Sequence, residues 1–144
     1  MKKSFRKLLL IVLIATAFSV PFLLAANCLP PVETGGNITI HIGELSFNPD
    51  TERDYIGQVL DDLVLSDDLV FEYQHSAFGR FITAIGGLRP NATGWIAVYL
   101  SYNNPRFAMP YTRQFNGKTF YSAGLGIDAL PALEGVSYLF VLAG

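Results

Sequence analysis

The chain has 144 residues and a formal net charge of −2, with ten Lys and Arg side chains against twelve Asp and Glu. Phosphate contacts need clustered basic side chains, so this scattered set argues against nucleic-acid binding. The length suits one domain with one hydrophobic core.

The N-terminus joins a basic segment, residues 1–7, to an uncharged apolar one, residues 8–26. This order, ending in small residues, is typical of a secretory signal peptide, and we expect cleavage after Ala26. An uncleaved anchor is the alternative, because an apolar stretch of this length can span a bilayer. Cleavage removes four bases and leaves six against twelve acids, a net charge of about −6 with no further membrane span. The secreted protein would then have a flexible lead, residues 27–36, and a domain at 37–144.

Cys28 is the single cysteine, so no internal disulfide is expected. Its position after the cleavage site allows lipidation, but an intermolecular disulfide or an inert thiol fits the preceding residues better. Sequons at Asn37 and Asn91 predict N-glycosylation in a eukaryotic secretory pathway.

The first predicted elements are a strand and a helix. Apolar residues alternate over residues 37–47, which indicates a half-buried strand. Residues 51–54 resemble a capping box, and apolar residues recur at helical spacing over 55–63. Asp61 and Asp62 lie where the helix dipole disfavours them. Adjacent helical side chains also diverge by about 100°, so this pair is not expected to form one acid/base site.

From residue 70 onward the sequence predicts strands and turns. Strands are expected at residues 70–74, 78–86, 95–102, 119–122 and 136–142, with a loop at 103–110 and a tight turn at Asn116–Gly117. In the strand at 95–102, one face carries Ile96 and Leu100, and the other displays Trp95 and Tyr99. One helix with six or seven short strands predicts a small α+β domain.

The stretch FGRFITAIGGL, residues 78–88, is apolar enough to be a buried strand, yet it carries glycines near both ends and an arginine near its start. It could therefore hold the core together or help to present a binding surface. We expect Phe81, Ile82 and Ile85 to build the core, and the glycines to let the chain turn.

Catalytic chemistry is not expected. The two histidines, His41 and His75, have no Cys, His or carboxylate at metal-ligand spacing, and the sequence has no phosphate loop, zinc helix motif or nucleophile elbow. The pair at 67–68 is predicted to be a turn, since a calcium loop alternates its acids with spacers. We therefore interpret the chain as a binding protein and not an enzyme.

The order of segments provides a resemblance. A strand, a helix ending in VLDDL, the stretch FEYQHSAFGRFITAIGGL and the strand GWIAVYL follow one another. This order resembles the C-terminal β-domain of the cobalamin carriers transcobalamin and intrinsic factor, and the related stand-alone domains. The matching positions are Phe78-Gly79, Phe81-Ile82-Thr83, Ile85-Gly86-Gly87 and Trp95, with looser matches at 121–124 and 134–136. The resemblance covers residues 37–142.

The resemblance implies a β-grasp-like domain, in which one helix packs on an antiparallel or mixed sheet. It also implies that loops and exposed aromatic residues cover one face of cobalamin or a related corrinoid. The ligand-binding residues carried over by position are His75, Phe78, Trp95, Tyr99, Tyr121 and Gly124. His75 is also the residue that would approach the cobalt.

No segment of this sequence is predicted to form the helical barrel domain that completes the carriers' site, so we expect a corrinoid to be covered on one side only and bound less tightly. The alternative is an extracellular protein-interaction or cell-surface module that keeps the fold without corrinoid binding.

Overall fold

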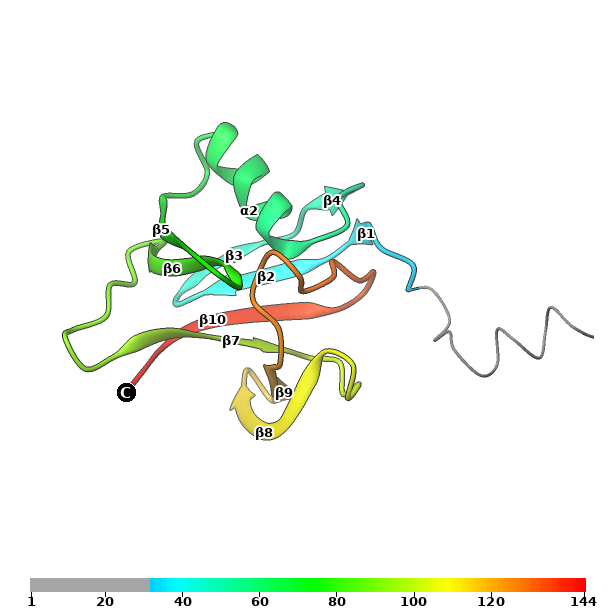
Figure 1. Ribbon diagram of the computed structural model, residues 1–144. Helices are drawn as coiled ribbons and strands as arrows, with labels where there is room; N and C mark the ends of the chain where they lie inside the picture. Colours follow the sequence, from blue (N-terminus) through cyan, green and yellow to red (C-terminus); the bar gives the residue numbers. More distant parts are fainter. Residues whose placement is uncertain (1–31) are drawn as a thin grey trace, which may run out of the picture. The chain divides into compact units, whose positions relative to one another are not determined.

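Two parallel strands, β2 (Thr39–Ile42) and β10 (Ser137–Ala143), lie side by side in a six-stranded mixed sheet. The computed structural model describes residues 32–144, so the predicted signal peptide and Cys28 lie outside the described residues (Figure 1). The sheet has the order β3-β2-β10-β7-β9-β8, and β2–β10 is its parallel pair. Its other strands are β3 (Leu45–Phe47), β7 (Trp95–Leu100), β8 (Ala108–Phe115) and β9 (Lys118–Ala123).

Outside the main sheet lie two strand pairs and a helix. The pairs are β1 (Gly36–Asn37) with β4 (Asp50–Thr51), and β5 (Phe71–Ser76) with β6 (Gly79–Ile85); the helix is α2 (Ile56–Leu65). The predicted α+β class is therefore confirmed. Within residues 32–144, no helix has the length and apolar character needed to cross a membrane.

The single strand predicted at residues 37–47 is wrong, because the chain reverses inside it. Gly43 has φ of 58°, a value that favours glycine, and the turn it forms lets β3 pair antiparallel with β2. The alternation itself predicted burial correctly, since Ile38, Ile40 and Ile42 are all buried.

The helix begins later than its sequence signals predicted. Its N-cap is Tyr55, and the side-chain oxygen of Gln58 accepts hydrogen bonds from the backbone N–H groups of Tyr55 (3.1 Å) and Asp54 (3.2 Å). Residues 51–54 do not cap it, because the hydroxyl of Thr51 accepts a hydrogen bond from the N–H of Arg53 instead. The apolar face of α2 is buried as expected, through Ile56, Val59, Leu60 and Leu63.

One face of the main sheet is covered by α2 and the β5–β6 hairpin (Figure 1). This face carries Ile40, Leu100, Tyr138 and Phe140, all fully buried, and cross-strand register places them on the same side. The hydroxyl of Tyr138 donates to the carbonyl of Pro131 (2.6 Å), and burial raises the pKa of Tyr138 to about 12. The same hydroxyl accepts the N–H of Leu133 at 2.9 Å, so both of its hydrogen-bonding roles are used inside the core.

The opposite face is covered in part by the β8–β9 hairpin, which curls beneath the sheet (Figure 1). The ring of His41 lies 5.1 Å from that of Phe115 and 6.3 Å from that of Phe120. Burial, and to a smaller degree the charge of Lys118, lower the pKa of His41 below its ordinary value of 6.5. His41 is thus part of an aromatic cluster with Phe115 and Phe120.

This cluster predicts a pH dependence of stability. The folded state disfavours the protonated His41 ring. The contribution of neutral His41 to the free energy of unfolding is therefore fully present above pH 6.5, and it is lost as the pH drops from there to the lowered pKa of the folded state. The free energy of unfolding, measured with urea over this pH window, should fall in the wild type but not in His41→Gln. An equal loss in both proteins would contradict this origin.

Candidate functional site: two loops held by Arg80

Arg80 on β6 joins three segments that are distant in the sequence. Its Nη2 donates to Oδ1 of Asp128 (2.8 Å), and its Nη1 donates to Oδ1 of Asp61 (2.6 Å) on α2. The backbone N–H of Arg80 also donates to Oδ2 of Asp128 (2.7 Å). The hairpin, the helix and the segment that carries Asp128 are therefore fixed to one guanidinium, whose side chain is only 13% exposed.

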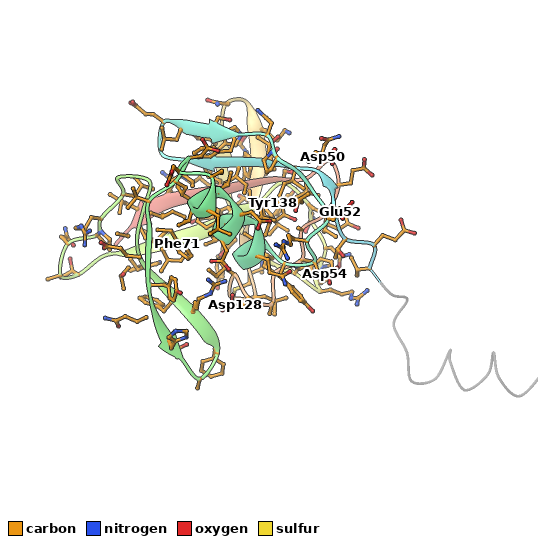
Figure 2. The ribbon with its side chains drawn as sticks, turned by 90° about the horizontal axis from the view of Figure 1, so that it is seen from above. Asp50, Glu52, Asp54, Phe71, Asp128 and Tyr138 are labelled. Atoms are coloured by element: carbon orange, nitrogen blue, oxygen red, sulfur yellow. The ribbon has the colours of Figure 1, made fainter. Side chains whose placement is uncertain are left out.

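Two aromatic rings of β5 complete the surroundings of Arg80. Its guanidinium carbon lies 4.9 Å from the ring centre of Tyr73 and 5.7 Å from that of Phe71, in the range of cation–π contacts. Figure 2 shows Phe71 on the hairpin strand and Asp128 beneath the helix. Hydrogen bonds from Arg80 hold the pKa of Asp128 below its ordinary value, so this carboxylate stays charged at neutral pH.

The two acids near the end of α2 bind different arginines. Asp61 binds Arg80, whereas Asp62 forms two hydrogen bonds with Arg53, at 2.9 and 3.0 Å. This confirms that the pair does not converge on one site. It also explains why acids are tolerated at this end of the helix, because each has a cationic partner that offsets the unfavourable dipole.

The Arg80 cluster brings two loops side by side. Gly79 has φ of 98°, and a Cβ there would lie 2.9 Å from Oδ2 of Asp128, so only glycine fits at the end of the hairpin turn. A Cβ on Gly126 would lie 3.5 Å from the carbonyl oxygen of Phe78. We call the turn at residues 76–79 together with the loop at 124–128 the two-loop surface.

The hairpin turn of this surface is ordered by its own hydrogen bonds. The hydroxyl of Ser76 donates to the carbonyl of Gly79 (2.7 Å) and accepts the N–H of Phe78 (3.2 Å). The side chain of Phe78 is 92% exposed and that of Leu125, on the neighbouring loop, is 38% exposed. The two-loop surface therefore presents apolar side chains on a backbone that is already held in place.

The six predicted ligand-binding residues do not share one surface. Phe78 belongs to the two-loop surface together with Gly124, and the exposed His75 lies at the end of β5, where its ring is 5.4 Å from that of Tyr73. Tyr121 pairs with Leu100, so it points to the helix side of the sheet.

Trp95 and Tyr99 lie on the other side of the main sheet. Tyr99 pairs with Leu139, which itself pairs with His41 of the aromatic cluster, so the two aromatic residues of β7 face away from α2. Trp95 is 49% exposed and Tyr99 is half-buried. A ligand on the two-loop surface would not contact them.

Two further sequence predictions concern exposed sites. Asn37 is exposed in β1, and Asn91 is exposed in the turn before β7, where its side-chain oxygen accepts hydrogen bonds from the N–H and the hydroxyl of Thr93 (both 3.1 Å). Their glycosylation stays a prediction.

Two corrections concern the stretch at residues 78–88. Ile82 and Ile85 are buried as predicted, but Phe81 is 54% exposed and is not a core residue. Arg80 was not predicted as the organising residue, because its main partner lies 48 positions away and no local pattern links them. The sequence signal that could have found it is a single arginine inside an otherwise apolar stretch, since a charge there requires a partner.

Two small hollows are lined by described residues. One apolar hollow of about 210 Å³ is lined by Val70 and residues 84–89, and another of about 120 Å³ lies between the turn at 90–94 and the C-terminus. Both are smaller than ordinary pockets for drug-sized ligands, which measure roughly 300–1,000 Å³. Neither of these two hollows would enclose a larger ligand.

Comparisons with known proteins support the fold alone. No protein-family model matches the sequence, and no curated protein matches it. Among solved structures, a Ruminococcus gnavus protein suggested to bind a metal is similar, with a TM-score of 0.51 and 18% identity over 77% of this chain and 97% of its own. Within residues 32–144, no group of three or more His, Cys, Asp or Glu side chains is placed to hold a metal ion.

The Arg80 cluster predicts a difference between two arginine-to-lysine changes. Arg80→Lys removes the forked contact with Asp128 and should lower the free energy of unfolding by about 1–3 kcal/mol. The control Arg53→Lys changes an exposed ion pair and should have no measurable effect. Urea unfolding measures the free energy of unfolding of each variant, and hydrogen exchange of the β5 and β6 amides shows whether the lost stability lies in the hairpin. Equal effects of the two changes would contradict the assigned role.

Proposed function

We propose that this chain is a secreted, non-catalytic binding module that covers one face of cobalamin or a related corrinoid with the two-loop surface. The observation that carries the proposal is the juxtaposition of the turn at 76–79 with the loop at 124–128. Of the six residues that the resemblance to the cobalamin carriers implies, Phe78 and Gly124 lie in these two loops and His75 lies beside them, whereas Trp95 and Tyr99 lie on the other side of the sheet. The adjacency of the loops adds an independent reason to place a ligand there. Secretion rests on the basic and apolar N-terminal segments.

The chemistry of the surface suits a large, flat, partly apolar ligand. Phe78 offers an aromatic ring and Leu125 an aliphatic side chain, and both are exposed beside backbone that is already ordered. Ordering the loops before binding lowers the entropy lost on association. His75, at the end of β5, supplies an imidazole near the same turn and is the residue we assign to approach the cobalt.

A β-grasp-like fold is part of this proposal. Its support is the sheet order β3-β2-β10-β7, in which the first hairpin is followed by α2 and the last strand returns parallel to β2. Such a sheet leaves the loops beyond its helix side free to contact a ligand, which is where the two-loop surface lies.

The affinity expected for this arrangement is modest. The ligand is covered on one side, and neither of the two hollows described above is large enough to enclose a macrocycle. Little of its surface is removed from water, so we expect binding in the micromolar range and not the tight binding of an enclosed ligand.

A second candidate, a protein-interaction module, is favoured by a different observation. On the face of the sheet away from α2, Trp95 is 49% exposed beside the exposed end of β10. Aromatic side chains on a rigid strand are typical anchors of protein interfaces. In this case Trp95 and Tyr99, and not Phe78, would be the contacts.

A titration with aquocobalamin and cobinamide, followed by corrin absorbance, tests the first candidate. We expect saturable spectral changes at micromolar concentration, and Phe78→Ala should weaken binding up to about tenfold, the value of one aromatic contact. Trp95→Ala is the matched control on the opposite face and should bind as the wild type does.

His75→Ala tests whether His75 coordinates the cobalt or only packs against the corrinoid. If His75 coordinates the cobalt, the variant should lose the spectral shift while it still binds the corrinoid. A flat titration at high micromolar concentration of folded protein would reject the corrinoid. Loss of binding in Trp95→Ala alone would move the ligand to the other face.

A further inference from the structure

Strand β8 (Ala108–Phe115) is an open edge of the main sheet. It stands last in the strand order and pairs with β9 alone. Its residues from Met109 to Gln114 are all exposed, and Tyr111 is 66% exposed. An edge of this kind presents unpaired backbone groups that can accept a further strand.

The register shows which backbone groups are free. Asn116 and Gly117 form the two-residue turn of the hairpin, with φ of 49° and 74°, so the flanking pair Phe115 and Lys118 exchanges hydrogen bonds. Because hydrogen-bonded and free pairs alternate along antiparallel strands, the N–H and C=O groups of Thr112 and Gln114 point away from β9.

The same edge is basic in a protein that is otherwise acidic. Residues 73–127 contain no Asp or Glu, although the chain has twelve of these acids. Among the described residues Arg113, in the middle of β8, is in no ion pair, whereas Arg80 and Arg89 are paired with acids. The acids Asp50, Glu52 and Asp54 lie in β4 or directly after it, and Figure 1 shows β4 above the main sheet and β8 below it.

We propose that β8 docks an extended, acidic segment of a partner protein as an added strand. The free groups of Thr112 and Gln114 provide the backbone hydrogen bonds, and Arg113 faces a carboxylate of the partner strand. Tyr111 adds apolar contact at the edge. This site is separate from the two-loop surface and does not depend on corrinoid binding.

The lengths of the two open edges disfavour a second copy of the chain that would pair its β3 with β8. The other open edge of the sheet, β3, has only three residues, too few to match the length of β8. A segment with alternating acidic and β-branched residues matches both the free backbone groups and the positive charge of the edge.

The probe is a short blocked peptide of alternating glutamate and valine, and the control peptide has lysine in place of glutamate. Binding to the purified protein is followed by the chemical shifts of β8 amides. We expect saturable binding of the acidic peptide only, weakened by added salt. Arg113→Glu should weaken it about tenfold or more. Thr112→Pro should abolish it, because proline removes an outward N–H while the bonds to β9 remain.

A third variant, Arg53→Glu, reverses an exposed charge outside the main sheet, between β4 and α2, and should bind the peptide as the wild type does. The corrinoid titration should be unchanged in Arg113→Glu, so failure of one proposal does not imply failure of the other. The proposal is overturned if neither peptide binds at millimolar concentration, if both bind equally, or if folded Thr112→Pro binds normally. Concentration-dependent dimers that shift the β8 amides without peptide would assign the edge to a second copy instead.

Discussion

The ion-pair cluster of Arg80 is the interaction on which the helix side of the domain depends. A two-stranded hairpin such as β5–β6 is marginal by itself in water. Here the hairpin is fastened to α2 through Asp61 and to the following segment through Asp128. Removing Arg80 from water is costly, and the two carboxylates with the rings of Phe71 and Tyr73 offset that cost.

The consequence of this cluster is geometric. Asp128 accepts hydrogen bonds from both the side chain and the backbone of Arg80, so the loop that carries Asp128 must follow the hairpin turn closely. Gly79 permits that approach, since a Cβ there would lie 2.9 Å from Oδ2 of Asp128. The apolar side chains of the two-loop surface are therefore placed by a polar interaction beneath them.

The two sides of the main sheet differ in how they are covered, and this separates two kinds of surface. The helix side is closed by α2 and the hairpin, and its exposed features are apolar residues on ordered loops. The opposite side is covered only in part by the curled β8–β9 hairpin, which leaves Trp95 accessible. The outer strand of this hairpin, β8, is the basic edge of the sheet. A small domain can thus offer an apolar loop surface and a charged strand edge without overlap.

Sequence patterns predicted the buried faces better than the boundaries of elements. Alternation identified the buried isoleucines of β2 and the buried face of β7, and helical spacing identified the buried face of α2. The strand β8 was missed, and its first residues were assigned to a loop. Its residues from Met109 to Gln114 are exposed on both faces and include Pro110, so it lacks the alternation that burial of one face produces. Phe81 was assigned to the core because it is apolar, although it points outward on a projecting hairpin.

What the sequence determined by itself is local: which faces are apolar, where glycine lets the chain turn, and that one helix accompanies several strands. These follow from side-chain period and backbone sterics, which act between near neighbours. Only the tertiary structure decided that β10 pairs with β2, that Asp128 binds Arg80, and that the six candidate residues divide between two sides of the sheet. Such pairings join segments far apart in the chain, and their energy arises only when the whole core has formed, so no local pattern encodes them.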